Sequence, residues 1–235
     1  MNFDIRQLDD ADLDSDEGQE AFEEYQEALL DRFTESPEGQ QRLEADPDMG
    51  FWAAQLMYYG WQYEGVTIPE MSALDVRSVV EELFPRKISL ESPEQADDAI
   101  PELVAFWKYL KREFDLPQAD AVLEALREVE PDFPGMMNDP SNFGMAKSFF
   151  MMGQAAGFDM TNEEGMNAFM QAYNAGIAAG RTPPGASTLA TLPSSRPAAS
   201  PFGPPRREDH AKKKAKKKKR KRSAQARKKN RKRRK

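Results

Sequence analysis

The residues of this chain with the clearest chemistry are lysines and arginines gathered at its C-terminal end. Between residues 212 and 235, 18 of 24 residues are basic. Each phosphate that such a row of cations neutralises releases condensed counterions, which gives an affinity that is independent of sequence and falls steeply with salt. We therefore expect this tail to bind nucleic acid, whether RNA, the ribosome or DNA, or another polyanion. The basic residues are Lys212, Lys213, Lys214, Lys216, Lys217, Lys218, Lys219, Arg220, Lys221, Arg222, Arg227, Lys228, Lys229, Arg231, Lys232, Arg233, Arg234 and Lys235.

The same tail lacks the features that recognise bases. It contains no aromatic residue on which a base could stack, and no scaffold that would aim an arginine at a groove edge. Sequence preference is therefore not expected. Three other interpretations stay open: a nuclear localisation signal if the source is eukaryotic, a solubility element, and a segment that folds back on the rest of the chain.

Charge is divided sharply along the chain. Residues 206–235 hold 20 Lys+Arg and 2 Asp+Glu, a net of +18. Subtraction from the whole-chain totals of 33 and 40 leaves 13 basic and 38 acidic residues in residues 1–205, a net of −25. The overall net charge of −7 is thus an average of two opposite parts. Because phosphates repel the acidic part, we expect that part to contact a protein partner instead.

The chain offers few of the usual catalytic groups. It has no cysteine, which excludes disulfides, Cys-ligated metals and thiol nucleophiles, and its one histidine, His210, precedes the tail. Acidic pairs such as Glu23–Glu24 and Glu81–Glu82 fall at helical positions expected to face water. We expect a non-enzymatic accessory or interaction protein without cofactor or metal. The alternative is an enzyme with a carboxylate-based site in a helical bundle, whose tail serves only for localisation or solubility.

The elements before the tail are expected to be helices. Apolar residues recur at three- and four-residue steps, and no segment alternates with the period of a strand. This predicts an all-α fold, a single globular bundle of about eight helices over residues 19–180. Start signals include Ser36–Pro37, Ser92–Pro93 and a capping box at Thr161, whereas Pro101 should break or kink its segment. The expected helices lie around residues 22–33, 36–45, 51–63, 67–84, 92–114, 116–131, 139–157 and 161–177.

Two clusters of large apolar residues favour core packing over function. Eight of the twelve methionines lie between Met136 and Met170, where a groove for a partner helix is the alternative. The aromatic segment 51–63 is also expected to be buried, with a base-stacking platform as the alternative. In the two last helices, the side chains expected to face inward are Phe143, Ala146, Phe149, Phe150 and Gly153, then Met166, Phe169, Met170, Tyr173 and Ile177.

The remaining segments are too polar or too rich in proline to bury a core. Residues 1–18 are expected to form an acidic, poorly ordered arm. Residues 181–211 are expected to be a disordered linker rich in Pro, Ser and Ala, and residues 212–235 a disordered tail. The N-terminus lacks the basic and apolar regions of a signal peptide, and no apolar run approaches the length of a membrane span. We therefore expect no membrane association, and a cytoplasmic location that becomes nuclear if the source is eukaryotic.

Overall fold

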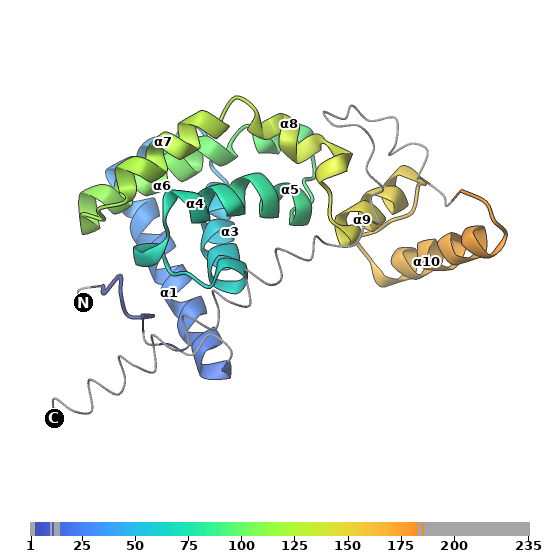
Figure 1. The fold of residues 1–235 in the computed structure, drawn as a ribbon, viewed down its shortest axis with the longest axis horizontal. Helices are drawn as coiled ribbons and strands as arrows, with labels where there is room; N and C mark the ends of the chain where they lie inside the picture. The colour runs from blue at the N-terminus through green and yellow to red at the C-terminus, as the bar shows by residue number, and fades with distance from the viewer. Residues whose placement is uncertain (1–2, 10, 12–14, 183–184, 186–235) are drawn as a thin grey trace. The chain divides into compact units, whose positions relative to one another are not determined.

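The computed structural model describes residues 3–9, 11, 15–182 and 185. These residues form α-helices joined by short 3-10 and π-helical turns, with no β-strand among them, which confirms the all-α fold class (Figure 1). None of the helices in this part of the chain is both long and apolar enough to cross a bilayer. Nearly all of the predicted linker (residues 181–211) and the whole predicted tail (residues 212–235) lie outside the described residues.

Packing divides the described chain into two compact units. The first comprises the described residues up to Val80 together with Asp97–Pro131. The second comprises Glu81–Ala96 with the described residues from Asp132 onward. The sequence predicts a single bundle with no boundary inside residues 19–180, because the second unit begins within a run of helical pattern and no linker composition marks the change.

The first unit is built from long helices around an aromatic core. Beside the helices run a π-helical turn at Gly60–Glu64 and a 3-10 turn at Ile68–Glu70. Its largest fully buried side chains include Trp61, Trp107 and Phe33, and α7 lies alongside α6 (Figure 1). The helices are α1 (Asp16–Glu35), α2 (Pro37–Leu43), α3 (Phe51–Tyr59), α4 (Ala73–Arg77), α6 (Ala99–Phe114) and α7 (Ala119–Val129).

Serine side chains begin three of these helices. Ser15 and Ser36 accept hydrogen bonds from the backbone N–H groups of Gly18 and Gly39, 3.0 and 3.1 Å away. Ser72 begins α4 with a complete capping box, in which the Asp75 carboxylate accepts from the Ser72 backbone. Each cap satisfies a donor that the first turn leaves without a helical partner and stabilises the helix by about 1 kcal/mol.

The sequence predicts that Pro101 breaks or kinks a helix, but in the structure it does neither. The start signal at Ser92 produces only a 3-10 turn, Pro93–Ala96, and α6 begins afterwards at Ala99. Pro101 therefore lies in the first turn of α6, where its missing N–H would have had no helical acceptor.

The described residues of the N-terminal stretch pack against α1. We expected residues 1–18 to form a poorly ordered arm, yet Ile5 and Leu8 are buried and α1 begins already at Asp16. The Tyr25 hydroxyl donates to the Ile5 carbonyl at 3.2 Å, and the rings of Phe3 and Tyr25 lie 5.3 Å apart. Three apolar side chains among the acids are enough to pack this turn against α1.

The second unit combines two very short helices with two longer ones. They are α5 (Phe84–Lys87), α8 (Phe133–Asn138), α9 (Met145–Ala155) and α10 (Glu163–Ala178). Gly144, the residue that immediately precedes α9, donates its N–H to the Arg86 carbonyl at 2.9 Å. A Cβ at Gly144 would lie 2.7 Å from that oxygen, so only glycine permits this approach.

The last two helices join through a small apolar cluster. Gly157 ends α9 in the left-handed conformation, as predicted, with φ +84°. Asn162, and not the expected Thr161, caps α10 by accepting from the Gly165 N–H at 2.7 Å. The fully buried members of the cluster are Phe143, Met152, Met160 and Phe169.

Candidate functional site

The basic residues of the predicted nucleic-acid site lie outside the described residues. This applies to all eighteen lysines and arginines from Lys212 to Lys235, and to His210. The structure does position other polar groups, and Glu102 is among the most deeply buried of them.

Glu102 is a fully buried carboxyl group that completes a neighbouring helix. It lies in α6, and its Oε1 accepts the backbone N–H of Ala53 at 2.7 Å. Ala53 is the third residue of α3, and the residue before that helix, Gly50, has no side chain with which to cap it. Glu102 thus supplies from another helix the acceptor that an N-cap residue normally provides.

The surroundings of Glu102 favour its protonated form. Burial raises the pKa of Glu102 to about 7, although hydrogen bonds from the backbone of Ala53 and Gly50 lower it. Asp46 raises this pKa further and Arg42 lowers it. Arg42 forms ion pairs with Asp46, at 3.4 Å, and with Asp98. Near neutral pH the group is therefore poised between its acid and its carboxylate.

This cluster lacks the arrangement that carboxylate catalysis requires. Among the residues that the structure describes, Glu102 Oε2 has no hydrogen-bond partner, and the side chain is fully buried. Among the described residues, no three acidic, histidine or cysteine side chains are grouped so that they could hold a metal ion. The enzyme alternative calls for inward-facing acids from facing helices that a substrate can reach, and Glu102 is not accessible in this way.

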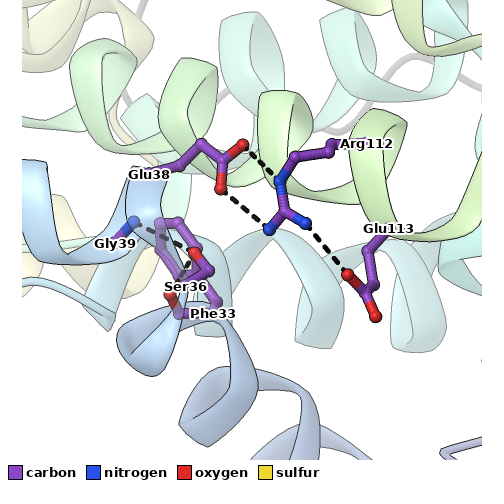
Figure 2. Close-up of polar contacts among 6 residues, drawn as sticks. All are labelled: Phe33, Ser36, Glu38, Gly39, Arg112 and Glu113. Atoms are coloured by element: carbon purple, nitrogen blue, oxygen red, sulfur yellow. Dashed lines mark hydrogen bonds and ion pairs between the residues drawn. The ribbon is translucent and has the colours of Figure 1, made fainter.

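A shallow basic hollow of about 410 Å³ lies on α6 and α7. Two of its four cations are already paired: Lys111 contacts Asp120 at 2.5 Å, and Arg112 contacts Glu113 at 3.0 Å. Arg112 also bonds both carboxylate oxygens of Glu38 at 2.8 and 3.1 Å (Figure 2). The lining residues are Lys108, Lys111, Arg112, Asp115, Asp120, Leu123 and Arg127.

The bidentate ion pair between Arg112 and Glu38 is best explained as a structural link between two helices. Glu38 lies in the first turn of α2, next to the Ser36 cap, so the ion pair ties the start of α2 to the end of α6 (Figure 2). The side-chain hydrogen bond from Arg112 lowers the pKa of Glu38. The four cations of the lining are balanced by Asp115 and Asp120 in the lining and by Glu38 and Glu113 beside it, so an incoming anion would meet little net positive charge there.

Lys147 is another buried ionisable group, and sequence reasoning missed it. Its ammonium donates to the carbonyls of Pro85 and Met137, each 3.0 Å away, and lies 4.0 Å from the centre of the Phe143 ring. Burial lowers the pKa of Lys147 to about 8. Both carbonyls belong to the short helices α5 and α8, so Lys147 satisfies acceptors that these helices leave without partners.

A small hollow of about 120 Å³ adjoins Lys147. It is lined by apolar and uncharged polar side chains together with Glu91. With two carbonyl acceptors and an aromatic face already around the ammonium, the lysine is held in place as a structural cation. This arrangement does not present a free amine to a substrate.

The prediction that the large apolar residues are buried is correct for only some of them. Trp52, Tyr59 and Trp61 are buried as expected, but Tyr58 and Tyr63 are exposed. In α10 the prediction was wrong for three positions, because 40, 47 and 55% of the surfaces of Met166, Met170 and Ile177 are exposed, and only Phe169 is fully buried.

In α9 the predicted buried face was wrong at Ala146. This residue is exposed, whereas the neighbouring Lys147 and Ser148 are buried. The buried residues of α9 are Lys147, Ser148, Met152 and Gly153, of which Gly153 had been predicted to face inward.

Comparison with known proteins does not extend these observations. No protein-family model matches the chain, and neither the curated proteins nor the solved structures contain a match. Any functional conclusion must therefore come from the charges and contacts described above.

Proposed function

We propose that this chain is a non-enzymatic accessory protein whose basic tail, residues 212–235, binds nucleic-acid phosphates without sequence specificity. The acidic helical body contacts a protein partner, and residues 181–211 connect the two activities. The protein works in the cytoplasm, or in the nucleus if its source is eukaryotic. The proposal is carried by one observation: a net charge of +18 in residues 206–235 is joined to a net of −25 in the rest of the chain.

The described part of the body supports a role away from phosphates. All eight acidic residues of α1 are exposed to solvent, and Arg32 is the only basic residue in that helix. A surface of this sign is repelled by a nucleic-acid backbone but leaves the body available to other proteins. The acidic residues are Asp16, Glu17, Glu20, Glu23, Glu24, Glu27, Asp31 and Glu35.

The tail supplies affinity through counterion release. For each phosphate that it contacts, the logarithm of the binding constant falls with the logarithm of the salt concentration, with a slope of about −0.7 on single strands and about −0.9 on duplex DNA. A tail that engages several phosphates at once therefore loses most of its affinity between low and physiological salt. Base composition of the target should have little effect.

A binding titration tests the proposal. We expect the intact chain to bind a single-stranded RNA and a DNA duplex with a steep salt dependence, and deletion of residues 206–235 to abolish that binding. A matched control permutes the order of residues 212–235 and so keeps the composition, charge and length of the tail. This variant should bind as tightly as the native chain, because the affinity does not depend on sequence.

Two outcomes would contradict the proposal. If the truncated chain keeps its affinity, the body and not the tail binds nucleic acid. If the permuted tail loses affinity, the tail recognises its target through a specific arrangement of residues. The protein partner is tested separately, by affinity purification of the truncated chain after nuclease treatment, since any partner retained there contacts the body directly.

A further inference from the structure

Exposed aromatic side chains gather on one side of α3 and of the π-helical turn that follows it. Phe51, Tyr58 and Tyr63, which we call the aromatic surface, are 46, 42 and 36% exposed. Phe51 and Tyr58 lie two helical turns apart on the same side of α3. The Tyr59 ring connects the two exposed tyrosines, with ring centres 5.3 Å from Tyr58 and 5.5 Å from Tyr63. Among the described residues of the first unit, Leu74 is the only other exposed large apolar side chain.

One edge of α1 borders the aromatic surface. The Gln26 side chain donates to the Ala54 carbonyl at 2.9 Å, and the Gln62 side chain donates to Gln19 Oε1 at 3.4 Å. Ala54 lies between the first two residues of the aromatic surface, and Gln62 immediately precedes the third. These two bonds hold α1 alongside α3 (Figure 1). The edge of α1 that carries Gln19 and Gln26 is therefore next to the exposed rings.

This edge of α1 is acidic. At 100° per residue, Glu23 lies within about 60° of both Gln19 and Gln26 around the helix. Glu27 follows Glu23 one turn later, and both carboxylates are exposed to solvent. The aromatic surface thus has two negative charges along its border, which repel the phosphates of a nucleic acid and attract a basic peptide.

Rings and carboxylates in this arrangement fit a proline-rich segment that ends in basic residues. A polyproline II helix has no internal hydrogen bonds, and PxxP segments in this conformation bind aromatic-lined surfaces. Tyrosine hydroxyls can donate to the backbone carbonyls of such a segment, and carboxylates form charge-assisted hydrogen bonds with arginine. Proline also reduces the conformational freedom that the segment loses on binding.

The chain contains such a segment at residues 201–207, which lie outside the described residues. It reads Pro-Phe-Gly-Pro-Pro-Arg-Arg, so two prolines have the PxxP spacing and two arginines follow. It is separated from Gly185, the last described residue, by 15 residues. A chain of this length can span up to about 50 Å. Tethering of this kind gives an effective concentration on the order of 1 mM, so even a weak contact is populated.

We propose that the aromatic surface and the acidic edge of α1 bind residues 201–207 of the same chain. The proline rings pack against Phe51 and Tyr58, and the two arginines pair with Glu23 and Glu27. This goes beyond the proposed function and does not depend on nucleic-acid binding, because the segment precedes the basic row at residues 212–235. The contact holds the beginning of the tail against the body and leaves the basic row available to phosphates.

A spin label beside the segment tests this contact in the full chain. The chain has no cysteine, so Ser200→Cys provides a single attachment site. Nuclear magnetic resonance of the isotope-labelled chain, treated with nuclease, then detects the amide signals that the label broadens. We expect the signals of residues 51–63 to lose most of their intensity, and to lose more than the signals of α7.

Substitution of prolines tests the segment without changing the described residues. Pro201→Ala combined with Pro204→Ala should restore the signals of residues 51–63, because it removes the PxxP spacing. The matched control, Pro193→Ala combined with Pro197→Ala, removes two prolines that precede the segment. This control should leave the broadening unchanged.

A substitution in the aromatic surface tests the other side of the contact. Tyr58→Ala should also restore the signals of residues 51–63. Its control is Leu74→Ala on α4, at a side chain that is 78% exposed, which should leave the broadening unchanged. Circular dichroism should show unchanged helix content for both variants, because both side chains lie at the surface.

The acidic edge is tested by removing its charges. Glu23→Gln combined with Glu27→Gln should weaken the broadening of residues 51–63. The matched control, Glu17→Gln combined with Glu24→Gln, makes the same change of charge on the opposite side of α1. This control should leave the broadening unchanged.

Four results would overturn the proposed contact. Two of them are an absence of broadening in residues 51–63, and broadening that the two pairs of proline substitutions affect equally. The third is broadening when a spin-labelled chain is mixed with an isotope-labelled chain that carries no spin label, since the segment would then bind a second copy. The fourth is weaker binding of single-stranded RNA by Tyr58→Ala, since the rings would then stack on bases. Deletion of residues 206–235 tests the proposed function separately, because none of these variants changes the basic row.

Discussion

Replacing Glu102 by glutamine should stabilise the first unit above neutral pH. Glutamine is a close isostere of the protonated acid: its carbonyl oxygen can still accept the Ala53 N–H at 2.7 Å, and it cannot ionise. At low pH, where Glu102 is itself protonated, the variant and the native chain should be equally stable. The difference between them isolates the free energy of ionising one buried carboxyl group.

The sign and size of the effect follow from the pKa. Burial raises the pKa of Glu102 from 4.5 to about 7, so the folded chain binds a proton more tightly than the unfolded chain does. Stability that depends on this proton is complete below pH 4.5 and is lost as the pH rises through 7. A change in pKa from 4.5 to about 7 corresponds to about 3 kcal/mol. At pH 8 the free energy of unfolding of the Glu102→Gln variant should therefore be higher than that of the native chain by up to this amount.

Urea unfolding followed by tryptophan fluorescence measures this difference. Trp52, Trp61 and Trp107 are the only tryptophans of the chain and are all buried in the first unit, so the signal reports the unit that holds Glu102. The control is Glu124→Gln on the exposed surface of α7, which makes the same change of charge. If the stability difference between Glu102→Gln and the native chain stays constant from pH 5 to pH 8, the assigned pKa and its cause are wrong.

Two further substitutions test how the helices are joined. Gly144→Ala should destabilise the second unit by about 1–3 kcal/mol, because the new Cβ would lie 2.7 Å from the Arg86 carbonyl. Faster hydrogen exchange in α5 and α9 would report it, whereas Gly135→Ala, which meets no atom within 4 Å, should be neutral or slightly stabilising. Ser36→Ala should lower the free energy of unfolding, measured with urea, by about 1 kcal/mol, because it removes the acceptor for the Gly39 N–H. An unchanged urea midpoint would show that this cap is dispensable.

Local signals in the sequence predicted the helices better than the faces they bury. Ser36 and Gly157 were identified correctly because a cap depends on residues within one turn. The buried face of α10 could not be identified in this way. Its sequence has apolar residues on more than half of its circumference, so periodicity alone does not say which of Phe169 and Met170 packs inward. That choice depends on Phe149 and Phe158, which come from other segments.

A signal for Glu102 was present and was overlooked. Its neighbours in helical spacing, Ala99, Phe106 and Tyr109, are all apolar, which places the carboxyl group on the buried face of α6. Lys147 gave a comparable signal as the only charged residue in α9. The hydrogen-bond partners of Glu102 and Lys147 could not be identified from the sequence. Ala53 lies 49 residues from Glu102, and Pro85 lies 62 residues from Lys147.

Glu102 and Lys147, two of the buried ionisable groups, are buried for the same structural reason, which argues against a catalytic role for either. Several helices of this chain are very short: α5 has 4 residues and α8 has 6. In helices of this length nearly every backbone donor or acceptor lies in a terminal turn and lacks a helical partner. Lys147 bonds carbonyls of α5 and α8, and Glu102 bonds an N–H at the start of α3. Each group is buried at the helix end that it completes, and this burial raises the pKa of Glu102 and lowers the pKa of Lys147. Neither perturbed pKa therefore points by itself to a catalytic site.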